Sequence, residues 1–398
     1  MQTTKLTLLP AATLAQLVRD RQLSPVEIVE AHLARIEALN PALNAYVHVD
    51  HQGARAAARR AEDAIRAGEP VGPLHGVPVS IKSAIAVAGM PWETGSRFRL
   101  GVRAESDATL VSRLRSAGAI VLGVTNTAEQ LMAWETDNVL YGRTNSPWDP
   151  ARTPGGSSGG ESAAISAGLS AGGVGSDGGG SIRVPAHFTG ICGLKPTPGR
   201  VPATGHFPPC GGPFALSGVV GPMARTIGDV DLLLRVMAGP DIGDPNGFPV
   251  PIGSMSDVAP PLRVGWFEDD GETPVTRETR EAVRRAAQAL EAAGFEVVPF
   301  RPEGLEEARQ LWWNIFGRAV RLVLEPAVMG REHDVHPNLL EFLEWTRRQP
   351  KLTAEELLQV EIARDGLKAR FLAQMEDVPV LLCPVSAVPA FRHGEREW

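Results

Sequence analysis

Cysteine is scarce in this chain, which has three cysteines in 398 residues and no CxxC pair. The odd, scattered set fits a reducing compartment and argues against a structural zinc site. Long apolar runs are also missing, so the sequence predicts no membrane-spanning segment, and residues 1–5 do not read as the start of a signal peptide. We therefore expect a cytoplasmic protein that uses no metal and no other cofactor.

An excess of positive charge is likewise missing. The formal net charge is -7, with 43% hydrophobic and 21% charged residues. This acidic balance argues against nucleic acid or an anionic membrane as the main partner, and the composition is that of a globular protein. We expect a small-molecule partner, and a homodimer remains open as the state of assembly.

Helix-like and strand-like segments alternate along the chain. Ser24–Glu27 has the pattern of a capping box, and the helix that it opens is expected to end near Asn40. Runs rich in β-branched residues at 77–82 and 119–124 flank a helical pattern at 107–117, which is typical of buried strands in an α/β fold. Further helices are expected at 54–67, 161–171, 226–238 and 276–293, and further strands at 219–222, 263–266 and 295–298.

Glycine and serine dominate residues 155–181. Each glycine inside a helix or strand costs about 0.5–1 kcal/mol relative to alanine, so this density needs a reason. Successive glycine N–H groups can converge on one point, which is what an oxyanion or a phosphate requires. The serines beside them favour acyl transfer.

Two familiar motifs match this region but lack the right context. Gly156–Gly160 fits the G-x-S-x-G nucleophile elbow, yet an elbow follows a strand, and the prolines at 147, 150 and 154 predict a turn instead. Gly173–Gly178 fits the dinucleotide-binding G-x-G-x-x-G, yet a helical pattern precedes it and no helix follows the motif directly. Neither motif is the preferred interpretation.

A third interpretation joins the glycine-serine loops to Lys82, the last residue of the strand-like run at 77–82. With Lys82 included, the chain resembles the amidase signature family of Ser-Ser-Lys amide hydrolases. The resemblance covers most of the chain up to about Asp244. It is carried, in order, by residues 76–82, 118–119, 125–126, 136–138, 141–145, 154–161, 175–185, 193–197 and 221–226.

The resemblance implies an amidase signature fold: a large twisted mixed β-sheet covered by helices on both faces. It also implies one domain spanning 1–398, with a helical part over 1–70, a catalytic core over about 71–240 and a variable substrate-side region over about 241–376. Family members normally continue for several tens of residues past the position of 380–384. A C-terminal part is therefore expected to be missing, which would leave a sheet edge unpaired.

The resemblance also implies a catalytic triad. Ser181 is the nucleophile, Ser157 is a bridging serine in a cis peptide, and Lys82 is the base. A lysine can act as a base near neutral pH only if its pKa falls from about 10.4 to roughly 7–8, which burial in the apolar strand would favour. Ser157 would then relay the proton of Ser181 to Lys82 and later deliver it to the leaving amine.

The glycines at 178, 179 and 180 complete the implied site. Their N–H groups, with that of Ser181, would form an oxyanion hole worth roughly 3–4 kcal/mol per donor in the transition state. Family members usually carry a larger residue where this chain has Gly178. This departure keeps the donor but would loosen the loop.

Three further residues are expected to support the site. Asp177 could act as an acid, but the preferred role is a brace that accepts hydrogen bonds from loop N–H groups. Arg183 is interpreted as half of a structural ion pair rather than as a ligand for a carboxylate substrate. Ser158 is expected to form hydrogen bonds in the site without relaying protons.

Two functions stay open at this point. The first is an amidase that hydrolyses a small-molecule carboxylic amide to an acid and an amine or ammonia. The second is the glutamine-hydrolysing component of a tRNA-dependent amidotransferase, its A subunit, which passes ammonia to a partner. Glu161, after Gly159 and Gly160, looks more like the branch of the fatty acid amide hydrolases, which favours the first.

Overall fold

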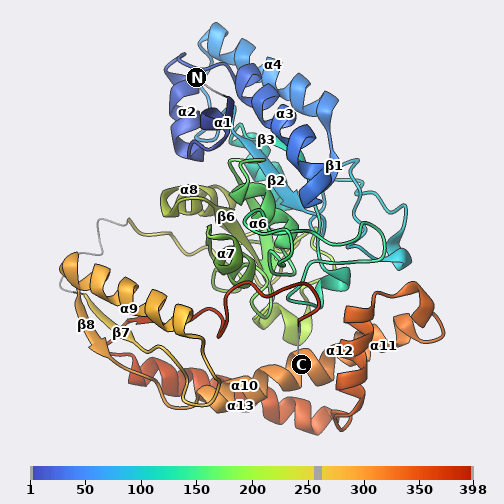
Figure 1. The fold of residues 1–398 in the computed structure, drawn as a ribbon, viewed down its shortest axis with the longest axis vertical. Helices are drawn as coiled ribbons and strands as arrows, with labels where there is room; N and C mark the ends of the chain where they lie inside the picture. The colour runs from blue at the N-terminus through green and yellow to red at the C-terminus, as the bar shows by residue number, and fades with distance from the viewer. Residues whose placement is uncertain (1–2, 255–261, 396–398) are drawn as a thin grey trace. The chain divides into compact units, whose positions relative to one another are not determined.

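The computed structural model describes residues 3–254 and 262–395 (Figure 1). Packing divides the chain into two compact units. The first contains Met1–Pro251, Arg331–Leu340 and Ala390–Glu397, and the second contains Ile252–Gly330, Glu341–Pro389 and Trp398. Compactness does not test how the chain folds, so the single domain expected from the sequence stays a prediction.

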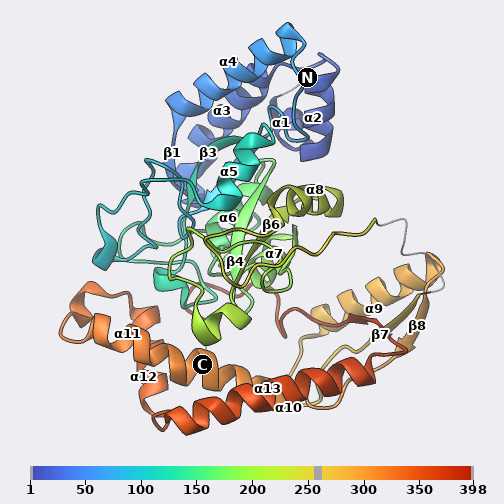
Figure 2. The ribbon, with the colours of Figure 1, turned by 180° about the vertical axis from the view of Figure 1, so that it is seen from behind.

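A six-stranded mixed sheet lies at the centre of the first unit (Figures 1 and 2). Its order is β1-β3-β2-β4-β6-β5. Strand β2 is parallel to β3 and β4, whereas β1, β6 and β5 pair with their neighbours in antiparallel fashion. The strands are β1 (Tyr46–Val49), β2 (Pro78–Lys82), β3 (Ile120–Thr125), β4 (Gly172–Asp177), β5 (Cys192–Gly193) and β6 (Val219–Ala224).

Helices cover both faces of this sheet, because β3 buries alternate side chains in opposite directions. Val121 packs in one apolar cluster with residues of α2, α5 and α8. Ile120 and Leu122 pack in another with residues of α3, α4 and α6. The helices of the first unit are α1 (Thr3–Thr7), α2 (Ala11–Arg19), α3 (Pro25–Leu43), α4 (His51–Ala67), α5 (Thr109–Ser116), α6 (Gly159–Ser166), α7 (Arg183–Thr189) and α8 (Ile227–Met237).

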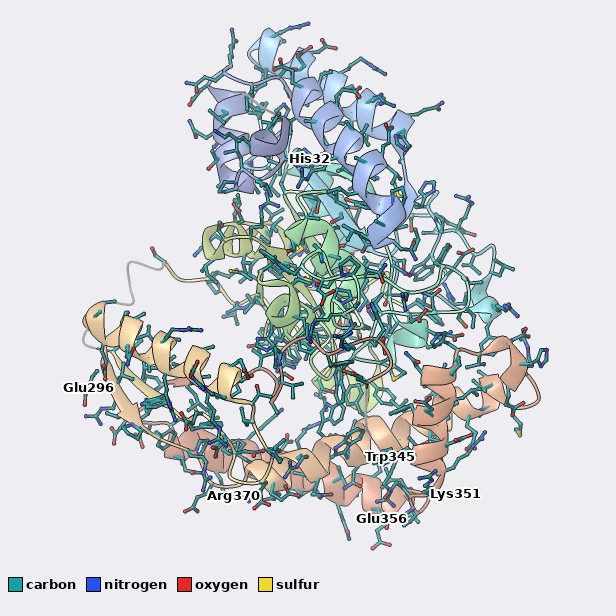
Figure 3. All side chains as sticks on the ribbon, viewed as in Figure 1. His32, Glu296, Trp345, Lys351, Glu356 and Arg370 are labelled. Atoms are coloured by element: carbon teal, nitrogen blue, oxygen red, sulfur yellow. The ribbon has the colours of Figure 1, made fainter. Side chains whose placement is uncertain are left out.

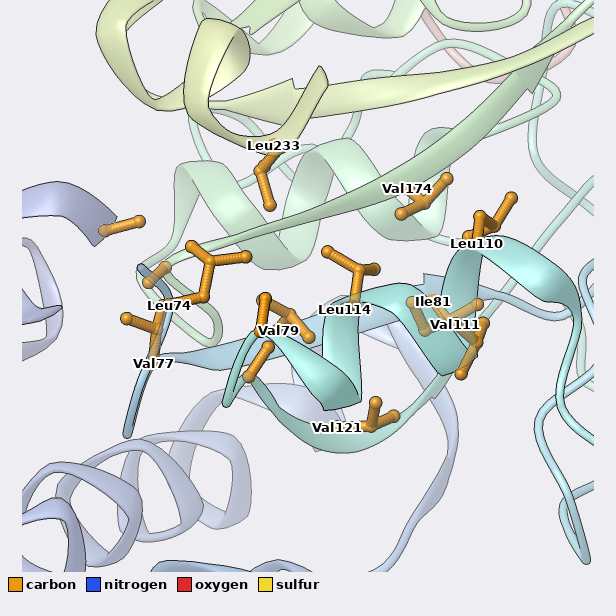
Figure 4. Packing of buried hydrophobic residues seen from close by; sticks show 14 of the residues in the cluster. Leu74, Val77, Val79, Ile81, Leu110, Val111, Leu114, Val121, Val174 and Leu233 are labelled. Carbon is orange, nitrogen blue, oxygen red and sulfur yellow. The ribbon is translucent and has the colours of Figure 1, made fainter. Parts of the chain in front are cut away.

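The core on the α5 face surrounds strand β2. Figure 4 shows Leu110 and Leu114 of α5 together with Val79 and Ile81 of β2. All four side chains are at most 1% exposed. Burying each contributes roughly 1.5–3 kcal/mol, so β2 and its last residue are firmly positioned.

Three sequence expectations differ from the structure. The first long helix does not end near Asn40 but includes Pro41 and runs to Leu43. Helix α6 ends at Ser166 instead of 171, because Gly168 takes a left-handed conformation and starts a turn. Residues 172–177, expected to be a glycine loop, form the central strand β4.

The second unit contains a small parallel sheet of order β8-β7-β9. Its strands are β7 (Arg263–Trp266), β8 (Glu296–Pro299) and β9 (Val380–Leu382), and β9 lies at an edge. The expected missing C-terminal part stays a prediction. The remaining helices are α9 (Arg277–Ala292), α10 (Leu305–Trp313), the π-helical turn Asn314–Ala319, α11 (Val320–Val328), α12 (Pro337–Arg347) and α13 (Ala354–Gln374).

Local signals position the helices of the second unit. Thr353 and Glu356 form a capping box at the start of α13, and Glu356 is marked in Figure 3. Trp313 packs against Trp345, with 4.5 Å between ring centroids. In the parts of the chain that the structure describes, no helix is both long and apolar enough to cross a membrane.

Candidate active site

Lys82 ends β2, and its side chain is completely buried. Its Nζ lies 2.7 Å from Ser157 Oγ, 2.9 Å from Ser158 Oγ and 3.1 Å from Ser176 Oγ. The strand carries apolar residues on both sides of the sheet up to this point, and it ends where the glycine-serine loops begin. The amine is therefore surrounded by hydroxyl groups in an apolar setting.

This setting changes the protonation of Lys82. Burial lowers the pKa of Lys82 to about 7, although the carboxyl groups of Asp177 and Glu161 act in the opposite direction. Near neutral pH, a substantial fraction of the amine is consequently uncharged. A neutral amine has two N–H donors and one lone pair, so it can accept a proton from one of the hydroxyls around it.

Ser157 follows a cis peptide bond, Gly156–Ser157, as the sequence resemblance implied. The Ser157 side chain is fully buried, and its carbonyl oxygen accepts a hydrogen bond from Thr127 Oγ1 at 2.8 Å. A side chain at Gly156 would come within 2.6 Å of the Ala133 carbonyl oxygen. Glycine is thus required before the serine for the two loops to approach each other.

Ser181 lies between β4 and α7, and it is 9% exposed. Its carbonyl oxygen accepts a hydrogen bond from the N–H of Ser158 at 3.2 Å, which ties its loop to the loop of Ser157. Among residues 3–254 and 262–395, the Ser181 hydroxyl has no hydrogen-bond partner. Lys82 and the two loop serines therefore meet through their side chains, whereas Ser181 joins them through its main chain.

Asp177 holds the loop that carries Ser181. Its buried carboxylate accepts the N–H groups of Gly180 at 2.8 Å and Ile182 at 3.1 Å. Arg183 donates from Nε and from its terminal nitrogen to the two carboxylate oxygens, both at 2.9 Å. Burial raises the pKa of Asp177, but the hydrogen bonds and charge of Arg183 outweigh it and leave the pKa lowered. The carboxylate is accordingly a charged brace.

The three glycines after Asp177 are not equivalent. Gly180 has a φ of +110°, which favours glycine, and its N–H is already donated to Asp177. The Gly179 carbonyl oxygen accepts a hydrogen bond from the Trp134 indole at 2.8 Å, so this loop is held from a second side. An oxyanion donor is therefore better sought at Gly179 and Ser181 than at Gly180.

Two residues of this cluster were missed by the sequence analysis. Ser176, on β4, contacts Lys82 through both its hydroxyl and its carbonyl oxygen. Glu161 is fully buried beside the same strands. An acid in the first turn of an otherwise small and apolar helix was the signal that could have identified Glu161. Within the described residues, no three His, Cys, Asp or Glu side chains cluster as metal ligands would.

Comparison with known proteins identifies the family. The sequence model of the Amidase family matches residues 27–398. The chain is 36% identical over 384 residues to the indoleacetamide hydrolase of Bradyrhizobium diazoefficiens, covering 95% of this chain and 72% of that protein. It is 35% identical over 391 residues to an acylamidase of Rhodococcus erythropolis, covering 96% and 80%.

Other relatives share the catalytic half or the fold. The glutamine-hydrolysing component of the glutamyl-tRNA(Gln) amidotransferase of Salinispora arenicola is 40% identical over 307 residues, which is 74% of this chain and 61% of that protein. A bacterial aryl acylamidase of the amidase signature family matches with a TM-score of 0.85 and 28% identity over 96% of this chain and 81% of that chain. A fatty acid amide hydrolase matches with a TM-score of 0.89 and 26% identity over 98% and 70%. This chain therefore belongs to the amidase signature family of amide hydrolases.

Proposed function

We propose that this amide hydrolase acts through an acyl-enzyme on Ser181, with Ser157 relaying protons to Lys82. The observation that carries the proposal is the buried Lys82 amine, 2.7 Å from the Ser157 hydroxyl. No other lysine is needed, and the lowered pKa of Lys82 supports a role as base near neutral pH.

The proposed reaction begins with proton transfer. Neutral Lys82 accepts the proton of Ser157, which takes the proton of Ser181 as the Ser181 Oγ attacks the acyl carbon. The negative charge of the tetrahedral intermediate falls on the former carbonyl oxygen, where the N–H groups of Gly179 and Ser181 are the proposed donors. Gly178 keeps its predicted place in this hole, whereas Gly180 supports it through Asp177.

The C–N bond then breaks. Ser157 donates its proton to the leaving nitrogen and regains one from the Lys82 ammonium, which returns to its neutral form. A water molecule attacks the Ser181 ester, with Lys82 and Ser157 accepting its proton by the same route. The acid is released and the serine is restored, so atoms and charges balance over the cycle.

The substrate is proposed to be a small-molecule amide. The names of the indoleacetamide hydrolase, the acylamidase and the aryl acylamidase make amides with an aromatic group the first compounds to test. Cytoplasmic location and independence from nucleic acid and membranes remain part of the proposal and rest on the sequence alone. The homodimer likewise stays a prediction.

The amidotransferase component is the second candidate, because those relatives reach 43% identity. That match covers 67% of this chain and 53% of the relative, whereas the indoleacetamide hydrolase aligns over 95% of this chain. The longer alignment favours the stand-alone hydrolase. Glutaminase activity that appears only with a partner protein would favour the alternative.

A fluorophosphonate probe tests the roles of the triad. Mass spectrometry should place the adduct on Ser181, and Ser181→Ala should remove it. Ser157→Ala and Lys82→Ala should leave slow residual turnover, because these residues move protons but do not bond to the acyl carbon. An adduct on Ser158 would contradict the assignment of the nucleophile.

A further inference from the structure

Glu161 lies in the first turn of α6 and is fully buried. Its carboxyl group bridges two strands, accepting hydrogen bonds from Ser80 Oγ of β2 at 2.5 Å and from Thr125 Oγ1 of β3 at 2.7 Å. Ser80 is two residues before Lys82, so the two side chains lie on the same face of the sheet. Thr125 pairs with Lys82 in register. The carboxyl group thus shares the face of the sheet that carries Lys82.

The neighbouring strand is shaped to admit this carboxyl group. Ser80 pairs with Gly173 of β4. A Cβ atom at Gly173 would come closer than 3.0 Å to Glu161 Oε1 and to the Ser80 carbonyl oxygen, a separation that real Cβ atoms essentially never show. The absent side chain leaves the room that the acid occupies. A glycine in the interior of a strand is costly, and here the close approach of Glu161 accounts for it.

No cation neutralises Glu161 by direct contact. Within 3–254 and 262–395, it forms no ion pair, and its two hydrogen bonds come from neutral hydroxyls. Burial raises the pKa of Glu161 to about 7, while Ser80, Thr125 and the charge of Lys82 act to lower it. The acid therefore titrates in the same range as the lysine.

The other charged or titratable groups around this cluster have separate partners. Tyr46 of β1 is neutral, because burial and the charge of Glu161 raise its pKa. Asp177 of β4 is paired with Arg183. Arg225, just after β6, donates to main-chain carbonyl oxygens, including that of Ser170 at 2.8 Å. Lys82 is thus the group left to respond to Glu161.

We propose that Glu161 is a positioning residue of the catalytic centre, whose buried carboxyl group sets the pH range over which the Lys82 amine is neutral. An ionised carboxylate stabilises the ammonium form of Lys82, whereas a protonated or absent one does not. The inference rests on the proposed function, since the charge of Lys82 matters in this way only if it is the base.

The hydroxyl network can serve both protonation states without moving heavy atoms. When Glu161 is ionised, it accepts both strand hydroxyls. When it is protonated, its O–H can donate to Ser80, whose own proton can turn to Ser170 Oγ, 2.9 Å away. The acid can therefore gain or lose a proton as Lys82 does the reverse.

The test measures how fast an alkyl fluorophosphonate labels Ser181 between about pH 5 and 9. Glu161→Gln keeps the shape and can pair with both hydroxyls, but it removes the charge. We expect the acidic limb of the profile to move to lower pH by about one unit, the lower end of what a nearby opposite charge produces. One unit below the wild-type midpoint, the neutral fraction of Lys82 would rise from about 9% to about 50%, roughly a fivefold faster labelling.

Two matched variants accompany it. Thr125→Val removes one hydrogen bond to Glu161, which raises the pKa of the acid and should move the limb in the same direction by less. Ser170→Ala touches Ser80 but not Glu161, and it should leave the limb in place. A merely structural role would lower the melting temperature of Glu161→Gln without moving its pH profile.

The two levels of the argument fail in different ways. Superimposable profiles for wild type and Glu161→Gln, with Lys82→Ala inactive, would overturn the role of Glu161 and leave the triad intact. Wild-type labelling by Lys82→Ala would overturn the proposed function itself. If Glu161→Gln does not fold, Thr125→Val decides alone, and an unmoved limb there would refute the inference.

Discussion

The brace at Asp177 makes the sharpest prediction for stability. Replacing it by alanine removes the acceptor of two buried N–H groups, those of Gly180 and Ile182. Each buried donor left without a partner costs roughly 1–3 kcal/mol, so Asp177→Ala should destabilise the fold by roughly 2–6 kcal/mol. This is a large part of the total of about 5–15 kcal/mol that is typical of a folded domain.

Arg183→Gln is the matched control. It removes the same ion pair but leaves the N–H groups of the loop bonded to Asp177. The Arg183 side chain is 44% exposed, so solvent screens the pair and the expected loss is about 1 kcal/mol or less. The difference between the two variants therefore reports the hydrogen bonds of the loop rather than the surface charge.

Urea denaturation gives the free energy of unfolding, and fluorophosphonate labelling well below the transition reports the loop. Asp177→Ala should label slowly even where it is folded, because the loop of Ser181 has lost its acceptor. The stability that Asp177 contributes should be complete above its unfolded pKa of about 3.9, and it should be lost as pH falls through the lower folded pKa. A variant with wild-type unfolding and labelling would refute this reasoning.

Three further predictions concern the sheet, the base and the loop. Gly173→Ala should unfold the protein or weaken it by several kcal/mol, because its Cβ would overlap Glu161, whereas Gly228→Ala, in open space on α8, should be neutral or up to about 1 kcal/mol stabilising in thermal unfolding. Amide hydrolysis should rise with pH through about 7, since the neutral Lys82 amine is the active form, and Lys82→Arg should not restore activity, because guanidinium stays protonated. Trp134→Phe loses one hydrogen bond to the glycine loop and should cost about 0.5–1.5 kcal/mol in urea unfolding, with slower labelling; an unchanged rate would show that the indole does not hold the loop.

Apolar pattern and recognisable motifs predicted much of this structure. The buried runs that became β2 and β3 and the capping box at Ser24 need only neighbouring residues to be recognised. The amidase signature family and its mixed sheet with helices on both faces are confirmed. These features are local, or they are carried by motifs that survive in one sequence.

Contacts between distant residues account for what was missed. Gly172–Asp177 reads as a loop because glycine disfavours strands, and only the approach of Glu161 explains why this strand needs glycine. Pro41 predicted the end of a helix that continues to Leu43. The donation of the Gly180 N–H to Asp177 depends on the turn between them. Such facts appear only when the chain is folded.

The fit of Glu161 against Gly173 also constrains how this protein can change over evolutionary time. A larger residue at 173 overlaps the acid, and a smaller one at 161 leaves a void lined by the hydroxyls of Ser80 and Thr125. Either step alone is costly, so the two positions should change together. Among related sequences we expect glycine at 173 to accompany glutamate at 161, and a side chain at 173 to occur where 161 is small.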